Sequence, residues 1–456
     1  MNGVKLKYYG FESLLSGADW LTPAYVGVDE KGIIKYLSSQ PDNGIAVEFV
    51  NGYVLPGFQN AHSHAFQYSM AGMNENFSSP SGENFWSWRD EMYKWALAIN
   101  PDELRSIATM LYAEMLRFGY TQVAEFHYLH HDKDGKPYQH LGEMASQLLE
   151  AANTAGIKIT LLPVFYQKGG LGREPEAGQR RFISKSRDDY FKLLEESKSL
   201  VANYQNAQLG FSVHSIRAVN LDDIVKTFEE GPKTLPFHVH LAEQKAEVVD
   251  CLAYCNQRPL AWFIDHLPVN ERFNFVHATH LDDYELNKIV ETKSNVILCP
   301  STEGNLGDGF FRMKEFSRSQ GRWSIGTDSH VCLDPLEEFR MIDYRQRLIT
   351  NERNTFEGDG AKYLINTALK NGRKAMGAEA KNNFSIGQSF DAVVYESPLL
   401  HPQILESKKT ATLVYAPSTR RVGTIVDGKW VVKDNHHFTA SMLKENFAQA
   451  IKKIVF

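Results

Sequence analysis

Cysteine is scarce in this sequence, and no long apolar run is present. The 456 residues include four cysteines and no C-x-x-C pair, which excludes a disulfide framework. No apolar stretch reaches the roughly 18 residues that a membrane-spanning helix needs. The N-terminal residues lack the apolar core of a secretory signal. We therefore expect a cytoplasmic protein that does not associate with membranes.

Positive charge is also in short supply. Lys and Arg number 49 against 55 Asp and Glu, so the formal net charge is −6. Nucleic-acid binding is not expected, because it needs clustered basic residues. No Gly-x-Gly-x-x-Gly loop follows any predicted strand, so the sequence has no dinucleotide-binding signature. The hydrophobic content of 43% is that of an ordinary globular protein and excludes a disordered or fibrous chain.

Both ends of the chain have the pattern of short antiparallel β-strands and hairpins. Residues 1–56 and 387–456 alternate apolar and polar positions between turns rich in Gly and Asp. Residues 411–417, with the sequence ATLVYAP, are interpreted as one of these strands. We predict a small β-sandwich domain assembled from both ends, with a C-terminal helix in its second part. It would enclose a central domain of residues 57–386.

The central region alternates β-rich segments with longer amphipathic stretches. One predicted helix, residues 101–118, has Asn100 as its N-cap, Pro101 at its first position and Gly119 just beyond its end. Eight strand–helix units imply parallel strand pairing and a closed (β/α)₈ barrel of the TIM type, so the fold class is α/β. A doubly wound open sheet is the competitor, and the missing phosphate loop argues against it.

Ionisable and polar residues gather where the predicted strands end. Barrel enzymes build their sites at the carboxyl ends of the strands, so this distribution indicates a functional site. Several buried imidazoles without partners would be costly, whereas one metal ion would satisfy them together. In chain order these residues are His62, His64, Glu125, His127, Tyr128, Tyr166, His214, Arg217, His238, His240, Glu243, His277, His280, Asp328 and His330.

The pair His62 and His64 has the spacing of two metal ligands. Residues i and i+2 of a strand point to the same face, so both rings enter the barrel mouth. A histidine of the fifth strand, either His238 or His240, and Asp328 of the eighth strand would complete a set of three histidines and one aspartate around a divalent ion. Spacing alone does not choose between His238 and His240, which also share a face.

Other residues at the strand ends suggest acid–base chemistry and a charged substrate. Glu243 follows the fifth strand, where its carboxylate can carry a proton between the attacking water and a leaving group. His277 is placed either to stabilise charge on a reaction intermediate or to support a metal ligand. Arg217 lies just past the fourth strand, and Arg89 lies in the aromatic stretch that follows the first strand after a long loop. These two arginines are suited to bind the two carboxylates of a dicarboxylate substrate.

Several motifs together resemble the amidohydrolase superfamily. They are PGFQNAHSHAFQ, FWSWRDEMY, AEFHYLHHD, HVHLAEQ, FVHATH, CPSTEGNLGDG and GTDSH, within residues 56–330. The sequence is more similar to the deaminases that bind one metal than to members that bind two, because no lysine at the end of the fourth strand is available as a bridging ligand. This resemblance implies a (β/α)₈ barrel, one divalent metal ion with zinc as the first candidate, and a homodimer.

The resemblance also implies roles for individual residues. The metal ligands would be His62, His64, His240 and Asp328, with Glu243 as proton shuttle and with His277 and Asp328 also taking part in catalysis. The substrate would contact Gln67, Arg89, Tyr128, His214 and Arg217. The implied reaction is metal-dependent hydrolysis of N-formimino-L-glutamate to N-formyl-L-glutamate and ammonia, as in histidine degradation. The alternatives are deamination of a nucleobase or related compound, and a barrel that binds a partner without catalysis.

Overall fold

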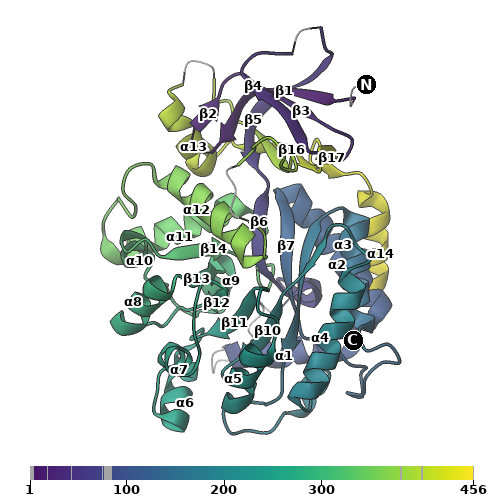
Figure 1. The fold of residues 1–456 in the computed structure, drawn as a ribbon, viewed down its shortest axis with the longest axis vertical. Coiled ribbons are helices and arrows are strands. Elements are labelled where there is room, and N and C mark those ends of the chain that lie inside the picture. The colour runs from purple at the N-terminus through teal and green to yellow at the C-terminus, as the bar shows by residue number, and fades with distance from the viewer. Residues whose placement is uncertain are drawn as a thin grey trace.

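A computed structural model describes residues 5–17, 19–42, 44–73, 75, 85–379, 383–401 and 404–454. Their strands form two sheets (Figure 1). One sheet consists of parallel strands ringed by helices, and the other is a mixed sheet that sits beyond the amino ends of the parallel strands. The molecule is therefore an α/β protein with a barrel and a β-rich unit, as predicted.

Eight parallel strands of the described chain form the barrel. The sheet path ends at β6 and β14, and these two ends are joined by a bridge between Ser63 and Asp328. Most of their residues are buried on both faces, as expected for strands that helices cover. In sheet order, the strands are β6 (Phe58–Ser63), β7 (Tyr120–His127), β8 (Lys158–Phe165), β10 (Phe211–Ser215), β11 (Phe237–Leu241), β12 (Phe273–His277), β13 (Asn295–Leu298) and β14 (Arg322–Ile325), and the short β9 (Ala207–Leu209) pairs with β8 outside this path.

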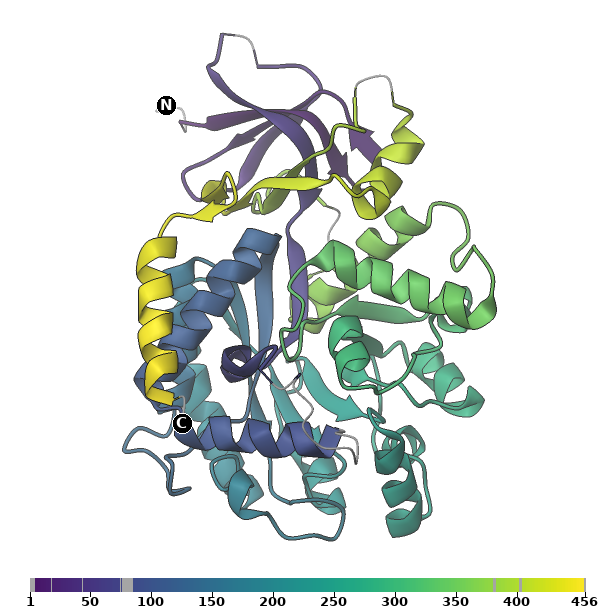
Figure 2. The same cartoon turned by 180° about the vertical axis from the view of Figure 1, so that it is seen from behind.

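Helices cover the outside of the barrel, and α1 (Phe85–Ala98) lies across the end at which the parallel strands finish (Figure 2). Helix α2 (Pro101–Phe118) has the predicted ends: the Asn100 side chain accepts the Glu103 N–H, and Gly119 closes the helix with φ = 97°. The other helices of this unit are α3 (Glu143–Ala155), α4 (Arg187–Val201), α5 (Leu221–Glu230), α6 (Lys245–Cys255), α7 (Pro259–His266), α8 (Asp283–Thr292), α9 (Pro300–Asn305), α10 (Met313–Arg318), α11 (Pro335–Thr350) and α12 (Gly360–Ala375), with short 3₁₀ turns at Ala65–Met70 and Ala177–Gln179.

Strands from both ends of the chain share the second sheet. Its centre is β5, which pairs in parallel with β1 and antiparallel with β15. The antiparallel pairing predicted for residues 1–56 is therefore wrong for β1 and β5, which are separated in the chain by β2, β3 and β4, and these strands allow a parallel return. β5 continues directly into β6 through Gly57, where a Cβ atom would lie 2.3 Å from the Thr121 side chain. The strands are β1 (Lys7–Ser16), β2 (Asp19–Leu21), β3 (Ala24–Val28), β4 (Ile34–Ser38), β5 (Val47–Pro56), β15 (Ala392–Glu396), β16 (Arg420–Val426), β17 (Lys429–Lys433) and β18 (His436–His437). The domain boundaries at residues 56 and 386 stay predictions.

The interpretation of residues 411–417 as a strand is wrong. Most of them lie in helix α13 (Glu406–Tyr415), which buries Lys409, Thr410, Leu413 and Val414, a spacing of three and four residues. A short apolar run does not distinguish a strand from one buried helix face, which explains the error.

The last described element is helix α14 (Ala440–Ile454), which packs against α2 on the outside of the barrel (Figure 2). It thus ties the C-terminal segment to the barrel wall. Among the residues that the structure describes, no helix has both the length and the apolar character needed to span a membrane.

Candidate active site

Three imidazoles and one carboxylate converge at the carboxyl end of the barrel. The Nε2 atom of His62 lies 3.2 Å from Nε2 of His64 and 3.0 Å from Nε2 of His240. Oδ1 of Asp328 lies 3.4 Å from Nε2 of His62 and 3.2 Å from Nε2 of His64. All four side chains are buried. Donor atoms about 2.05 Å from a central ion at tetrahedral corners are about 3.3 Å apart, so these distances fit one divalent metal.

Hydrogen bonds from the other ring nitrogens orient two of these imidazoles. Nδ1 of His64 bonds to the Phe126 carbonyl at 2.9 Å, and Nδ1 of His240 bonds to the His214 carbonyl at 3.0 Å. A proton held on Nδ1 leaves the Nε2 lone pair free for a metal. Burial lowers the pKa of His62 to about 3, so its ring is also neutral.

The structure brings His240, and not His238, into the donor group. Nε2 of His238 instead bonds to the Ala375 carbonyl at 2.7 Å. Two residues along a strand correspond to about 6.6 Å, so His238 lies one layer further from the barrel mouth. Spacing left the choice between His238 and His240 open, and the family resemblance favoured His240. The structure places His240 with His62, His64 and Asp328, as the resemblance implied.

A buried scaffold holds the segment that carries the first two histidines. The Glu125 carboxylate accepts the Ser63 hydroxyl at 2.7 Å, the Ala65 N–H at 2.6 Å and the Tyr112 hydroxyl at 3.1 Å. Burial raises the pKa of Glu125 to about 7, against the effect of these hydrogen bonds. The sequence placed Glu125 at a strand end and assigned it no role, and these contacts now show that it fixes the backbone on both sides of His64.

A second chain of contacts links the last strand to the first. The Asn60 side-chain amide donates to Thr327 Oγ1 at 2.8 Å, Thr327 Oγ1 lies 2.9 Å from Nδ1 of His330, and Nε2 of His330 lies 3.1 Å from the His64 carbonyl. Burial lowers the pKa of His330 to about 3. A neutral His330 therefore accepts a hydrogen bond from Thr327 at Nδ1 and donates one to the His64 carbonyl at Nε2. Both ring nitrogens are thus engaged, so His330 positions His64 and is not a metal ligand.

Left-handed backbone is concentrated where the strands enter the site. Non-glycine residues are uncommon at positive φ, and a cluster of them marks a backbone held by its surroundings. The residues are Ala242 (φ 47°), His277 (φ 69°), Ala278 (φ 51°), Asp328 (φ 49°) and His330 (φ 66°).

His277 lies beside the donor group, between three carboxylates. Its Nε2 is 3.8 Å from Glu243 Oε1 and 3.8 Å from Asp328 Oδ2, and its Nδ1 is 3.5 Å from Glu303 Oε1. Burial lowers the pKa of His277, but the nearby negative charges of Glu243, Glu303 and Asp328 raise it to about 10. Sequence reasoning missed Glu303, whose position in the CPSTEGN motif was its only signal.

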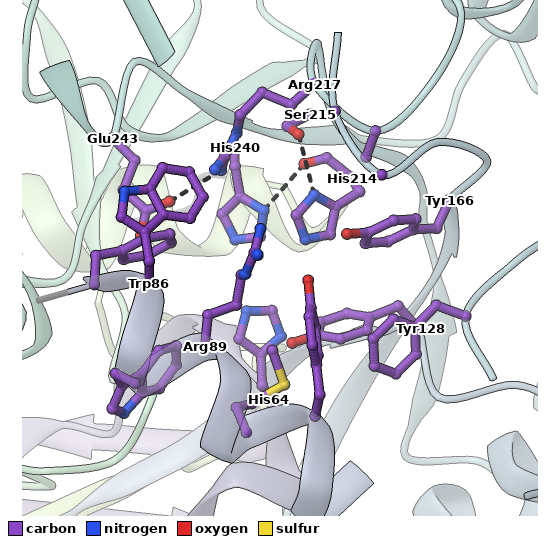
Figure 3. Close-up of a pocket in the computed structure, with 18 of the residues that line it drawn as sticks. His64, Trp86, Arg89, Tyr128, Tyr166, His214, Ser215, Arg217, His240 and Glu243 are labelled. Carbon is purple, nitrogen blue, oxygen red and sulfur yellow. Dashed lines mark hydrogen bonds and ion pairs between the residues drawn. The ribbon is translucent and has the colours of Figure 1, made fainter. Parts of the chain in front are cut away.

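All of the predicted substrate-contacting residues line one pocket above the donor group. Gln67 donates to the Tyr128 hydroxyl at 2.9 Å, and Nδ1 of His214 lies 3.1 Å from Ser215 Oγ. Figure 3 shows that Arg217 and Arg89 reach into the pocket from opposite walls. Trp86, Trp88, Tyr93, Tyr166 and Phe182 complete the wall around the predicted residues.

The two pocket arginines have different surroundings. Arg89 of α1 stacks over the rings of Trp86 and Tyr93, with its guanidinium carbon 4.8 and 5.2 Å from the ring centres. Its Nη2 lies 3.4 Å from Glu176, whose side chain is 53% exposed. Arg217 is 15% exposed and is flanked by Glu243 and Glu247, both buried. Glu247 was not predicted, because its pairing with Arg217 depends on the tertiary fold.

Comparison with known proteins agrees with this geometry. A model of the amidohydrolase family matches residues 53–431. The chain belongs to the amidohydrolase family. It is 37% identical over 454 residues to formimidoylglutamate deiminase of Pseudomonas aeruginosa, covering 97% of this chain and 98% of that protein. The resemblance inferred from the motifs is thereby confirmed.

Solved structures support the same assignment. This amidohydrolase superimposes on the crystal structure of an amidohydrolase from Brucella melitensis with a TM-score of 0.93 and 36% identity, covering 99% of this chain and 100% of that one. An adenosine deaminase from Xanthomonas campestris with bound zinc gives a TM-score of 0.82 at 22% identity, covering 98% of each chain. The second likeness supports the fold only.

Proposed function

We propose that this amidohydrolase converts N-formimino-L-glutamate and water to N-formyl-L-glutamate and ammonia. The observation that carries the proposal is a pocket in which a metal-donor group adjoins two arginines, Arg89 and Arg217. A hydrolytic metal site explains the reaction class, and the arginines suit a substrate with two carboxylates. The 37% identity to formimidoylglutamate deiminase over nearly the full chain supports the choice of substrate.

The proposed metal is one zinc ion, held by His62, His64, His240 and Asp328. Three imidazole nitrogens and one carboxylate oxygen are donors that zinc accepts, and their spacing fits its radius. Zinc is bound in crystal structures of two proteins with a similar fold, the adenosine deaminase above and an atrazine chlorohydrolase from Arthrobacter aurescens. When bound, such an ion lowers the pKa of water and so supplies a nucleophile at neutral pH.

The remaining chemistry is proton transfer and charge stabilisation. The reaction forms a carbon–oxygen bond at the formimino carbon and breaks the bond from that carbon to the terminal nitrogen, and both hydrogens of the water end on the departing ammonia. Glu243 carries a proton from the water to this nitrogen, and Asp328 Oδ2 takes part as the second acceptor. His277, whose Nδ1 lies 3.5 Å from Glu303, stabilises charge that develops at the carbon's oxygen.

Selectivity for a dicarboxylate is assigned to the two arginines. An uncharged analogue makes no charge-assisted pairs with the two guanidinium groups, so it is expected to bind less tightly than a dicarboxylate. The expected homodimer and the expected cytoplasmic location stay predictions.

Ammonia release with purified, metal-loaded protein tests the proposed function. N-formimino-L-glutamate is compared with guanine and adenosine under the same conditions. We expect N-formimino-L-glutamate to be turned over with a kcat/KM at least about a thousandfold above that of either nucleobase compound, because only the former pairs with both arginines. Preferential release from guanine or adenosine would replace this proposal with a nucleobase deaminase.

Replacing Arg217 by methionine is expected to raise KM for N-formimino-L-glutamate by about tenfold to a hundredfold, because a buried charge-assisted pair is lost. Arg89→Met is expected to raise KM as well, but by a smaller factor, since Arg89 also faces the exposed Glu176. Initial-rate kinetics measure both effects. The matched control is Arg105→Met on the outer surface of α2, where Arg105 pairs with exposed Asp102. Unchanged KM in Arg217→Met would remove Arg217 from substrate binding.

A further inference from the structure

Arg217 lies between two buried carboxylates of the same segment. Its Nη2 is 3.2 Å from Glu243 Oε2, and its Nε is 3.0 Å from Glu247 Oε2. Figure 3 shows the Arg217 side chain beside His240, with its contact to Glu243 inside the pocket. The side chains of Glu243 and Glu247 are 8% and 0% exposed, so solvent screens these charges weakly. Burial lowers the pKa of Arg217, but the charges of Glu247 and Glu243 outweigh it and keep the guanidinium protonated.

The two carboxylates differ in how firmly they are held. Glu247 lies in the first turn of α6, and its Oε1 accepts the backbone N–H of Ala242 at 2.8 Å. Ala242 is in the left-handed region, with φ = 47°. Glu247 thus holds the turn that leads to Glu243 and touches Arg217 with its other oxygen. It does not line the pocket, so no substrate competes for it.

Glu243, in contrast, faces the pocket and the reacting groups. Its Oε2 contacts Arg217, and its Oε1 points toward Nε2 of His277 at 3.8 Å. Nη2 is the terminal nitrogen of Arg217 that Glu243 contacts, so a substrate carboxylate that pairs with Nη2 takes the place of Glu243. The Nε edge, facing Glu247, is not available to it. A carboxylate at Nη2 and Glu243 compete for one nitrogen, whereas a carboxylate bound at Nη1 alone would leave the Glu243 contact in place.

We propose that Glu247 is a positioning residue that holds Arg217 as a carboxylate receptor, and that the substrate carboxylate displaces Glu243 from Arg217 and so frees it for proton transfer. This rests on the proposed function, since it assumes a substrate with a carboxylate. No covalent bond changes in the displacement, which exchanges one ion pair for another. An amidine without a carboxylate leaves Oε2 of Glu243 paired to Arg217, and this ion pair makes the carboxylate a poorer proton acceptor. Recognition of the carboxylate is thereby coupled to catalysis.

Glu247→Gln tests the positioning role. Glutamine keeps the size of the side chain, and its amide oxygen can still accept the Ala242 N–H, but the charge that anchors Arg217 is lost. Arg217 then pairs more strongly with Glu243, so we expect KM for N-formimino-L-glutamate to rise about tenfold and kcat to fall several-fold. The dissociation constant of glutarate, measured by calorimetry on metal-loaded protein, is expected to rise by the same factor as KM.

Glu285→Gln is the matched control. Glu285 of α8 is also buried, lies 2.7 Å from Nε of Arg258 and accepts the Leu260 N–H at 3.1 Å, but it does not line the pocket. A merely structural effect would change the melting temperature of both variants and leave KM and kcat unchanged. Wild-type KM, kcat and glutarate affinity in folded Glu247→Gln would overturn the positioning role.

A crystal structure with glutarate separates this proposal from the proposed function. We expect a glutarate carboxylate on Arg217 Nη2, Glu243 beyond hydrogen-bonding distance from Arg217, and Glu247 unmoved. If Glu243 still contacts Arg217 in that complex while N-formimino-L-glutamate is turned over, the displacement is wrong and the proposed function stands. If glutarate displaces Glu243 but N-formimino-L-glutamate is not hydrolysed, the proposed substrate is wrong and the displacement stands.

Discussion

Replacing Glu243 by glutamine is expected to lower kcat by about a thousandfold, within the range of about 10² to 10⁴ typical of a lost general acid–base group. The carboxamide matches the carboxylate in size but does not carry a proton from water to the departing nitrogen. The Glu243 oxygens are not part of the donor group formed by the three histidines and Asp328. Metal content is therefore expected to equal that of the wild type, as measured by mass spectrometry of the purified protein.

The outcome separates proton transfer from binding. A pure binding role predicts a raised KM at a preserved kcat, whereas a proton shuttle predicts a lowered kcat with a small change in KM. Glu285→Gln again serves as the control for loss of a buried carboxylate. A Glu243→Gln variant that retains metal and turns over within tenfold of the wild-type rate would rule out the shuttle role.

His240→Asn is expected to weaken zinc affinity by at least a hundredfold and to abolish turnover. Perturbing a residue that only supports a ligand costs about 10- to 100-fold in affinity, so removing a ligand costs more. The asparagine amide places an N–H group near the position of Nδ1, where it keeps the hydrogen bond to the His214 carbonyl. The substitution removes Nε2, the atom that would bind the metal. Zinc titration of protein first stripped with a chelator measures the change.

The neighbouring histidine supplies the control for this variant. His238 is as buried as His240 and lies on the same strand, but its Nε2 bonds to the Ala375 carbonyl. In His238→Gln the glutamine amide reaches the same carbonyl, so zinc affinity is expected to stay within about threefold of the wild type. Equal losses of zinc affinity in both variants would mean that the loss comes from disturbed packing of the barrel interior and not from removal of a metal ligand.

The barrel and most of the donor group could be predicted from the sequence, because both follow from patterns between residues that are close in the chain. Strand–helix alternation dictates parallel pairing, and the i, i+2 spacing of His62 and His64 places both rings on one face. Spacing could not decide between His238 and His240, because the choice depends on where strand β11 ends. A sequence pattern does not fix a strand boundary to within two residues. The resemblance to known motifs supplied that choice.

Long-range contacts account for what the sequence did not predict. The parallel pairing of β1 with β5 and the helix at Glu406–Tyr415 depend on neighbours that are remote in the chain. Glu247 is similar, because its position in the first turn of a helix suggests only a favourable charge at the helix start. Its contact with Arg217, thirty residues earlier, is created by the alignment of two barrel strands.

The most direct test of the account measures zinc and ammonia release on the same protein sample. Wild-type protein is stripped with a chelator, titrated with zinc, and assayed with N-formimino-L-glutamate at each step. We expect activity to be absent from the stripped protein and to rise in proportion to bound zinc until one equivalent is reached. Hydrolysis by the metal-free protein, or a protein that binds no zinc at this site, would contradict it.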